Sequence, residues 1–201
     1  ALPDYAVGTF DGPVFAADGT TNGVVKLTVA KNGKISGTVQ TNCVDAAAKK
    51  LTLSVASFAD YDLETGDFTL VPTYKDGKET VEVPLTLSGA EVEEGVTNGV
   101  VFSESLAAYQ NVLKGVAATA FAVPTLGAYT NLAVTVQKDG VLKVAGKVAD
   151  NSGKLISASG SSQIYWDADE KGYRAVIYLP SKAGFDGVAE IVEVELNGEK
   201  E

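Results

Sequence analysis

The stretch that decides the fold is Val25–Val39, with the sequence VKLTVAKNGKISGTV. Hydrophobic and polar residues alternate on both sides of its central Asn32-Gly33 pair. Such alternation is typical of a strand with one buried face, and Asn-Gly accepts the positive φ angles of a tight turn. The stretch therefore predicts an antiparallel hairpin closed by a type I′ turn.

The same two signals recur along the chain. Asp76-Gly77 and Asp139-Gly140 each stand between further alternating runs, and Pro84 predicts a strand at a sheet edge or one with a bulge. In the first half we expect strands near residues 6–16, 23–31, 34–41, 49–58, 66–75 and 79–89. In the second half we expect them near residues 117–125, 130–138, 141–149, 154–166, 172–180 and 187–197.

An internal repeat relates the two halves. Thr28–Gly33 reads TVAKNG, and Thr135–Gly140, 107 positions later, reads TVQKDG. Downstream, Ile35–Val39 resembles Val144–Val148. The repeat predicts a duplication with a first β repeat at 1–95, a connector at 96–116 and a second β repeat at 117–201. The pentapeptide TNGVV also occurs twice, at 21–25 and 97–101, but its spacing differs and we interpret it as coincidence.

The connector holds the best helix candidate of the chain, Ser103–Gly115. Ser103 is a suitable N-cap, Leu106, Tyr109 and Leu113 form an apolar stripe, and Gly115 suits the C-terminal end. Such a helix could plug a barrel or connect two of them. The fold class we expect is thus all-β, with two related antiparallel barrel-like or sandwich-like repeats and one short connecting helix.

The composition of the chain argues against several classes of function. The net charge of −10 repels phosphate backbones and anionic lipid, so we expect no nucleic-acid partner. No apolar stretch approaches the roughly 20 residues of a spanning helix, so we expect no direct membrane insertion. The chain has no His, which removes the usual general base and the commonest metal ligand. We therefore expect no enzyme activity, no cofactor and no metal.

Two further features bear on cellular location. Cys43 is the only cysteine, cannot form an internal disulfide and is interpreted as a buried small hydrophobe. The chain has no Met, which indicates a removed leader or a fragment, and Ala1–Asp4 would suit a chain left by signal-peptide cleavage. We expect a secreted, periplasmic or cell-surface protein.

The segment richest in chemically active side chains is Ile164–Arg174, which holds the only Trp and the only Arg. Aromatic faces beside carboxylates suit sugar binding, because rings stack on C–H faces while acids accept hydroxyl protons. The candidate ligand-binding residues are Tyr165, Trp166, Asp167, Asp169, Tyr173 and Arg174. The alternative is a hairpin with a solvated acidic tip and aromatic side chains packed across its strands.

Part of the same segment has calcium-loop spacing. Asp167, Asp169 and Gly172 fit that spacing, but Lys171 stands where a ligand is needed and no acidic residue closes the loop. An equivalent acidic turn, Asp60–Glu64, occurs in the first half. We interpret both turns as solubilising tips.

The glycine pattern of the first half carries a family resemblance. Gly8–Gly12 reads Gly-x-aromatic-x-Gly and is followed by the strand Val25–Val29 and by Gly33–Gly37. This pattern resembles repeats of exported bacterial β-barrel proteins and, distantly, the barrel domains of transferrin-binding-type surface lipoproteins. The resemblance covers residues 8–39 well and implies a barrel-like fold and a surface location, without catalytic residues.

Three functions remain open at this level. The first is an exported non-catalytic surface or periplasmic module that binds a protein or glycan partner or builds the cell envelope. The second is a carbohydrate-binding module that uses Tyr165, Trp166 and Tyr173. The third is a carboxylate-dependent glycan hydrolase, although nothing in the sequence selects a catalytic pair from 26 acidic residues.

Overall fold

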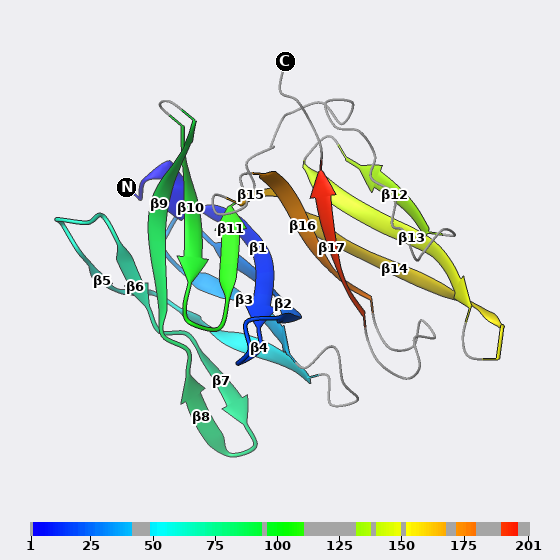
Figure 1. Cartoon of the computed structure of the whole chain (residues 1–201). Coiled ribbons are helices and arrows are strands. Elements are labelled where there is room, and N and C mark those ends of the chain that lie inside the picture. Colours follow the sequence, from blue (N-terminus) through cyan, green and yellow to red (C-terminus); the bar gives the residue numbers. More distant parts are fainter. Residues whose placement is uncertain are drawn as a thin grey trace.

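The computed structural model describes residues 2–41, 49–93, 96–110, 132–137, 140–149, 152–167, 172–179 and 190–196. Nearly all of these residues lie in antiparallel strands or in the turns between them, which confirms the all-β class (Figure 1). The helical part of this region is a single 3₁₀ turn, η1 (Asp4–Ala6), at the N-terminal end.

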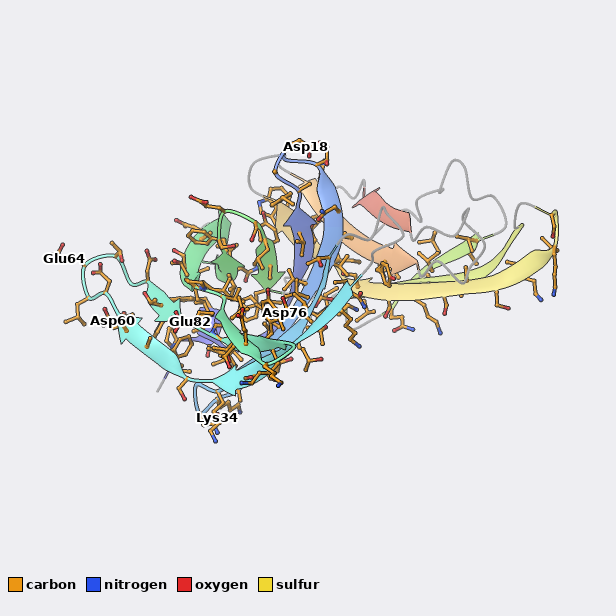
Figure 2. The ribbon with its side chains drawn as sticks, turned by 90° about the horizontal axis from the view of Figure 1, so that it is seen from below. Asp18, Lys34, Asp60, Glu64, Asp76 and Glu82 are labelled. Atoms are coloured by element: carbon orange, nitrogen blue, oxygen red, sulfur yellow. The ribbon has the colours of Figure 1, made fainter. Side chains whose placement is uncertain are left out.

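The first half builds a nine-stranded sheet in the order β4-β3-β2-β1-β11-β10-β9-β6-β5. Its strands are β1 (Gly8–Phe15), β2 (Thr21–Val29), β3 (Ile35–Thr41), β4 (Lys49–Ala56), β5 (Phe58–Tyr61), β6 (Phe68–Leu70), β9 (Leu85–Glu93), β10 (Val96–Phe102) and β11 (Ala107–Gln110). The sheet curls into a half-barrel around one hydrophobic core (Figures 1 and 2). Charged side chains such as Asp60, Glu64 and Lys34 project from its outer side (Figure 2).

The 3₁₀ turn η1 closes one end of the half-barrel. The Tyr5 hydroxyl donates to the Gly66 carbonyl at 2.9 Å, and its ring meets Phe68 edge-on. The Gln110 amide donates to the carbonyls of Asp4 and Val7 at 2.9 and 2.8 Å. Because these bonds come from the turn between β5 and β6 and from β11, they hold η1 over one end of the core.

A separate two-stranded hairpin, β7 (Thr73–Asp76) and β8 (Glu79–Glu82), lies beside β4 at the opposite end. Gly77 starts its two-residue loop with φ +60, as the Asp-Gly signal predicts. Each strand expected here is divided in two: 66–75 into β6 and β7, and 79–89 into β8 and β9. Pro84 explains the second break, because it has no N–H for a ladder and lies between β8 and β9.

The expected helix at Ser103–Gly115 is wrong for residues 103–110. The chain instead turns from β10 into β11: the Ser103 N–H donates to the Leu106 carbonyl at 3.0 Å, and the Ser103 hydroxyl accepts the Ser105 N–H at 3.2 Å. The edges of β1 and β10 offer backbone partners on both sides of β11, and this pairing overrides the local helix preference. Residues 111–115 lie outside the described residues, as does Cys43.

The second half contributes two three-stranded sheets. One is formed by β12 (Leu132–Val136), β13 (Val141–Ala149) and β14 (Leu155–Gln163), and the other by β15 (Tyr165–Asp167), β16 (Gly172–Leu179) and β17 (Glu190–Leu196). Strand β16 packs against β1, β2 and β14. A small shared core of Val24, Tyr165 and Val176 joins this half to the half-barrel.

The hairpin turns of the repeat differ from the predicted type. The Gly33 N–H donates to the Ala30 carbonyl and the Ala30 N–H donates to the Lys34 carbonyl, both at 2.9 Å. These bonds close a three-residue loop in which Gly33 has φ +82, so the turn is type I with a glycine bulge and not type I′. Gln137 and Gly140 make the corresponding bonds at 2.8 and 2.9 Å, so the matched motifs close their hairpins in the same way.

Strand registers in the two halves also correspond. In three different ladders, a pair of residues in the first half has an equivalent pair in the second half. The residue numbers of the second pair are those of the first pair plus 107. The equivalent pairs are Val25↔Val39 and Leu132↔Gly146, Val39↔Leu51 and Gly146↔Ala158, and Phe68↔Leu87 and Ala175↔Val194. These registers support the duplication. That the two complete halves are duplicates stays a prediction. The segment that would correspond to β1 falls at 115–122, outside the described residues.

Candidate functional site

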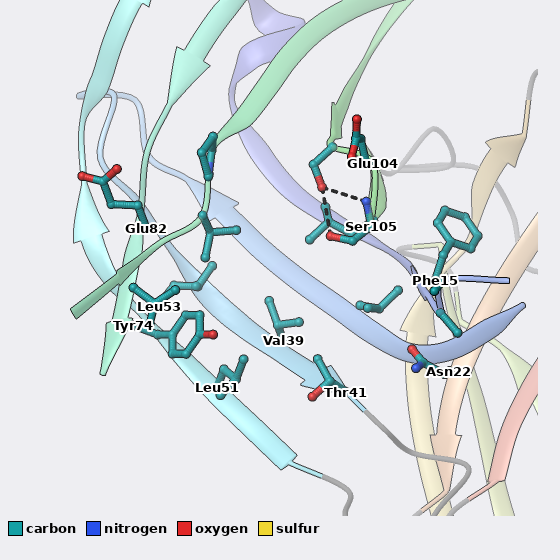
Figure 3. Close-up of a pocket in the computed structure, with 18 residues that line it drawn as sticks. Phe15, Asn22, Val39, Thr41, Leu51, Leu53, Tyr74, Glu82, Glu104 and Ser105 are labelled. Carbon is teal, nitrogen blue, oxygen red and sulfur yellow. Dashed lines mark hydrogen bonds between the residues drawn. The ribbon is translucent and has the colours of Figure 1, made fainter. Parts of the chain in front are cut away.

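A large cavity lies at the end of the half-barrel opposite η1. Its volume is about 790 Å³, and it is bounded by β3, β4, the β7–β8 hairpin, the end of β1 and the 103–106 turn (Figure 3). Its lining residues are Val14, Phe15, Ala16, Ala17, Asn22, Val39, Thr41, Leu51, Leu53, Tyr74, Val81, Glu82, Val83, Pro84, Ser103, Glu104, Ser105 and Leu106.

The wall of this cavity is mainly aliphatic. Val39, Leu51 and Leu53 come from the concave face of β3 and β4, where every second side chain points inward. Tyr74 and Val81 come from the hairpin and face them across the space (Figure 3). Because the hairpin supplies this second wall, the cavity exists only while the hairpin lies over β4.

Asn22 is a polar residue in the wall of this cavity. The β1–β2 register shifts so that Val14 pairs with Gly23 and Phe15 with Thr21, which makes Asn22 the extra residue of a β-bulge. A bulge re-aims the side chain that it carries. Asn22 is one of the lining residues, and its Oδ1 atom is buried without a hydrogen-bond partner in the structure. Leaving a buried acceptor without a partner costs about 1–3 kcal/mol.

The pentapeptide TNGVV, interpreted from the sequence as a coincidence, lies in β2 in its first copy and in β10 in its second copy. Its two copies place Asn22 and Asn98 in the sheet, and both side-chain amides have a buried atom without a partner. The glycine after each asparagine allows close backbone approach, since a Cβ on Gly23 or Gly99 would lie 1.9 Å from a carbonyl oxygen. The repeated pentapeptide thus has a structural counterpart, although only Asn22 lines the cavity.

The mouth of the cavity is polar. The hydroxyl oxygens of Ser103 and Ser105 lie 3.2 Å apart beside it. Glu82 and Glu104 are exposed at its rim, and their carboxylates point away from the aliphatic wall (Figure 3). Among the described residues that line the cavity, these two are the charged ones, and none is cationic.

A second, smaller cavity of about 390 Å³ lies between the halves, and most of the residues that line it are of polar type. Asp11, only 5% exposed, accepts the Gln163 N–H at 2.9 Å and the Ser162 hydroxyl at 3.3 Å. Lys26, which pairs with Asp11 across β1 and β2, donates to the Ser161 carbonyl at 2.7 Å. Burial raises the pKa of Asp11, and the Gln163 N–H, the Lys26 charge and the Ser162 hydroxyl counteract part of that rise. The hydrogen bonds of Asp11 and Lys26 thus hold β14 against the half-barrel.

The residues predicted from the sequence to bind ligand do not share one face. Tyr165 is buried and stacks on Tyr109, so it belongs to the contact between the halves. Trp166, on the opposite face of β15, is half-buried and meets its cross-strand partner Tyr173 edge-on, with centroids 5.0 Å apart. Arg174 pairs with Tyr165 across the strands.

The rest of that predicted site is only partly described. The backbone of Asp167 ends β15, and Asp169 lies outside the described residues. The sugar-binding role therefore stays a prediction, and Trp166 and Tyr173 are the pair that could carry it.

In the first half, the Asp62 carboxylate of the acidic turn accepts the N–H groups of Glu64 and Thr65 at 2.8 and 3.2 Å, so it caps the turn of its own hairpin.

Two further classes of site concern metals and membranes. No group of three or more His, Cys, Asp or Glu side chains is placed to hold a metal ion in the described parts of the chain. None of the helical segments among the same residues is long and apolar enough to cross a membrane.

Comparison of the chain with protein-family models, with curated proteins and with solved structures gave no match.

Proposed function

We propose that this chain is a non-catalytic binding module that takes a small, mainly apolar ligand into the 790 Å³ cavity of the half-barrel. The observation that carries the proposal is the mainly aliphatic wall that β3, β4 and the β7–β8 hairpin build around this space. Small-molecule sites combine such a wall with a few placed polar groups, and this volume lies within their usual range of about 300–1,000 Å³.

The rim carboxylates favour binding over hydrolysis. A glycosidase needs two carboxyl groups about 5–10 Å apart that face each other across the substrate. Glu82 and Glu104 are exposed and point away from the cavity. Among the described lining residues, most side chains are aliphatic, which suits retention of an apolar ligand.

A fluorescent probe tests the proposal. N-phenyl-1-naphthylamine, which is apolar and emits strongly when it leaves water, should bind the whole chain saturably with one site. The variant Val81→Trp should abolish that binding, because the added ring would fill the space between the hairpin and β4. A Val81→Trp protein that binds the probe as tightly as the wild type contradicts the proposal.

The matched control is Thr80→Trp on the same strand. Thr80 is exposed, points to the other face of β8 and does not line the cavity. Binding should survive this change. Loss of binding in both variants would show that the probe reports the integrity of the hairpin rather than the cavity, and the proposal would fail.

Export stays a separate prediction that rests on the resemblance of residues 8–39. Fractionation of the producing cells, followed by immunoblotting, tests it. Recovery with the cytoplasmic fraction alone contradicts a surface, periplasmic or secreted location.

A further inference from the structure

We propose that the outer face of the sheet β12-β13-β14 binds an anionic polysaccharide, a linear sugar polymer that carries carboxylate groups. This surface is separate from the cavity of the proposed function and takes a different class of ligand. Its central residues, which we call the lysine–serine face, are Lys143 and Lys147 of β13 and Ser157, Ser159 and Ser161 of β14. The lysines pair with the carboxylates of the polymer, and the serines bond to its hydroxyl groups.

Strand alternation places these five side chains on one exposed face. In the ladder between β13 and β14, Lys143 pairs with Ser161 and Lys147 pairs with Ser157, with Ser159 midway along the same row. All five residues are exposed. The sheet extends away from the half-barrel, and its opposite face packs against β16 (Figure 1). The buried side chains of that opposite face include Leu142, Val144 and Ala158.

The charge of this sheet is opposite in sign to that of the whole chain. The described residues of β12, β13 and β14 include two lysines and no Asp or Glu, whereas the chain as a whole carries a net charge of −10. Exposed charges farther apart than about 8 Å are largely screened at physiological ionic strength. An anion close to the lysine–serine face is therefore attracted by its lysines, while the acidic turns elsewhere on the chain repel it.

The half-barrel adds a third lysine at one end of this face. Lys26 of β2 is exposed, and its Nζ atom donates to the Ser161 carbonyl at 2.7 Å. Its ladder partner Asp11 is buried and accepts the Ser162 hydroxyl at 3.3 Å. Because the Asp11 carboxylate offsets part of the Lys26 charge, the two lysines of β13 supply most of the attraction.

The spacing along the strands suits an extended polymer. Residues four apart on a strand are separated by about 13 Å, so Lys143 and Lys147 reach carboxylates on separate sugar units. The serine side chains beside them repeat at intervals of roughly 7 Å. A serine hydroxyl both donates and accepts hydrogen bonds, as sugar hydroxyls do, so the row between the lysines matches the uncharged part of the polymer.

The residue types on this sheet favour a polysaccharide over a nucleic acid. Sites for single-stranded nucleic acids use aromatic rings to stack the bases, and arginine is well suited to hold phosphates through two parallel hydrogen bonds. The described residues of β12, β13 and β14 include neither an aromatic residue nor an arginine. Trp166 and Arg174 belong to the other sheet of the second half.

Polygalacturonate, a linear polymer of a sugar acid, tests the proposal by isothermal titration calorimetry with the whole chain. It should bind at low ionic strength and more weakly as salt is added. Its fully methyl-esterified form has the same backbone without the charges and should bind at least about tenfold more weakly. Absence of binding by polygalacturonate at low salt, or equal binding of the two forms, overturns the proposal.

A double variant tests the two lysines. Lys143→Gln with Lys147→Gln should weaken binding of polygalacturonate about tenfold, because both ammonium groups are lost from the face. The matched control, Lys75→Gln with Lys78→Gln, removes the same charge from exposed positions of the β7–β8 hairpin and should bind as the wild type does. Equal losses in the two double variants would show a response to total charge alone and would overturn the assignment to this sheet.

Two other polyanions test the class of partner. Poly-L-glutamate and oligothymidylate carry no hydroxyl groups along their length, so both should bind more weakly than polygalacturonate at equal concentration of charge. Binding of either one as tightly as polygalacturonate overturns a polysaccharide as the partner. The Lys143→Gln and Lys147→Gln variant should still bind N-phenyl-1-naphthylamine, because neither lysine lines the cavity, so failure of this inference is distinguishable from failure of the proposed function.

Discussion

The phenol rings of Tyr109 and Tyr165 stack face to face, with centroids 4.5 Å apart and planes inclined by only 6°. Tyr109 belongs to β11 of the half-barrel and Tyr165 to β15 of the second half. With Val24 and Val176 they form the apolar part of the contact between the halves, next to the polar cluster around Asp11. An aromatic pair and a buried carboxylate therefore both contribute to the contact between the halves.

Removing the stacked ring should destabilise the protein strongly. Tyr165 is 2% exposed, and truncation of a buried aromatic residue to Ala costs about 3–5 kcal/mol. Tyr109→Ala should cost less, because Tyr109 is half-buried. Urea unfolding of both single variants and the double variant should give a coupling energy of about 1 kcal/mol. Strict additivity would show that the stack contributes nothing beyond burial.

Asp11 should make stability depend on pH. Because burial raises its pKa, the folded chain holds the Asp11 proton more tightly than the unfolded chain does. The contribution of Asp11 to the free energy of unfolding is greatest below the ordinary carboxyl pKa. It is lost as the pH rises through the raised pKa of the folded chain. Compared with the wild type, Asp11→Asn should therefore gain stability between pH 4 and pH 7, measured by urea unfolding. Parallel pH profiles for the two proteins would contradict this.

Asp18 should make stability depend on pH in the opposite direction, so it serves as a control for Asp11. The Thr20 hydroxyl and N–H donate to its carboxylate at 2.6 and 3.0 Å and lower its pKa. Its contribution is present above the ordinary carboxyl pKa and is lost as the pH falls. Asp18→Asn should thus lose stability at neutral pH relative to acid, and any effect should be small because the side chain is exposed.

Gly12, the last glycine of the Gly-x-aromatic-x-Gly motif, should tolerate no side chain. A Cβ there would lie 1.9 Å from the Ala107 carbonyl oxygen of β11, so Gly12→Ala must push β1 and β11 apart. We expect a loss of about 3 kcal/mol. Gly153→Ala has open space but a positive φ of +81 and should lose only about 1 kcal/mol. Thermal unfolding that ranks the two variants in the reverse order would contradict the close approach.

The aromatic pair Trp166 and Tyr173 tests the sugar-binding alternative. Neither residue lines the main cavity, so Trp166→Ala should leave the binding of N-phenyl-1-naphthylamine unchanged. We also expect the fluorescence of Trp166 in the wild type to stay constant across a panel of neutral oligosaccharides. A saturable shift with one glycan would support the carbohydrate-binding function instead.

Local patterns predicted the strands because each pattern depends on residues close in sequence. The run expected at 141–149 is strand β13, Val141–Ala149, and the turn glycines Gly33 and Gly140 have the positive φ expected of them. The helix expected from Ser103 failed because its apolar residues also fit a strand. Leu106 and Ala108 are buried alternately, and the neighbouring strands that decide between the two forms lie far away in sequence.

The cavity could not be predicted from any single segment. Its wall combines the end of β1, the strands β3 and β4, the β7–β8 hairpin and the 103–106 turn. The segment chosen instead, 164–174, stood out for its rare residue types, but the fold buries Tyr165 between the halves. Asn22 reaches the cavity wall as the extra residue of a bulge, which only the paired strands reveal.

A ligand site in the half-barrel cavity is tested most directly by methyl NMR on the whole chain in the presence of 1-octanol. Intermolecular NOEs should connect the alkyl protons of octanol with the methyl groups of Val39, Leu51 and Leu53, and should disappear in Val81→Trp. NOEs to other methyl groups, or none at saturating octanol, would contradict a ligand site in this cavity.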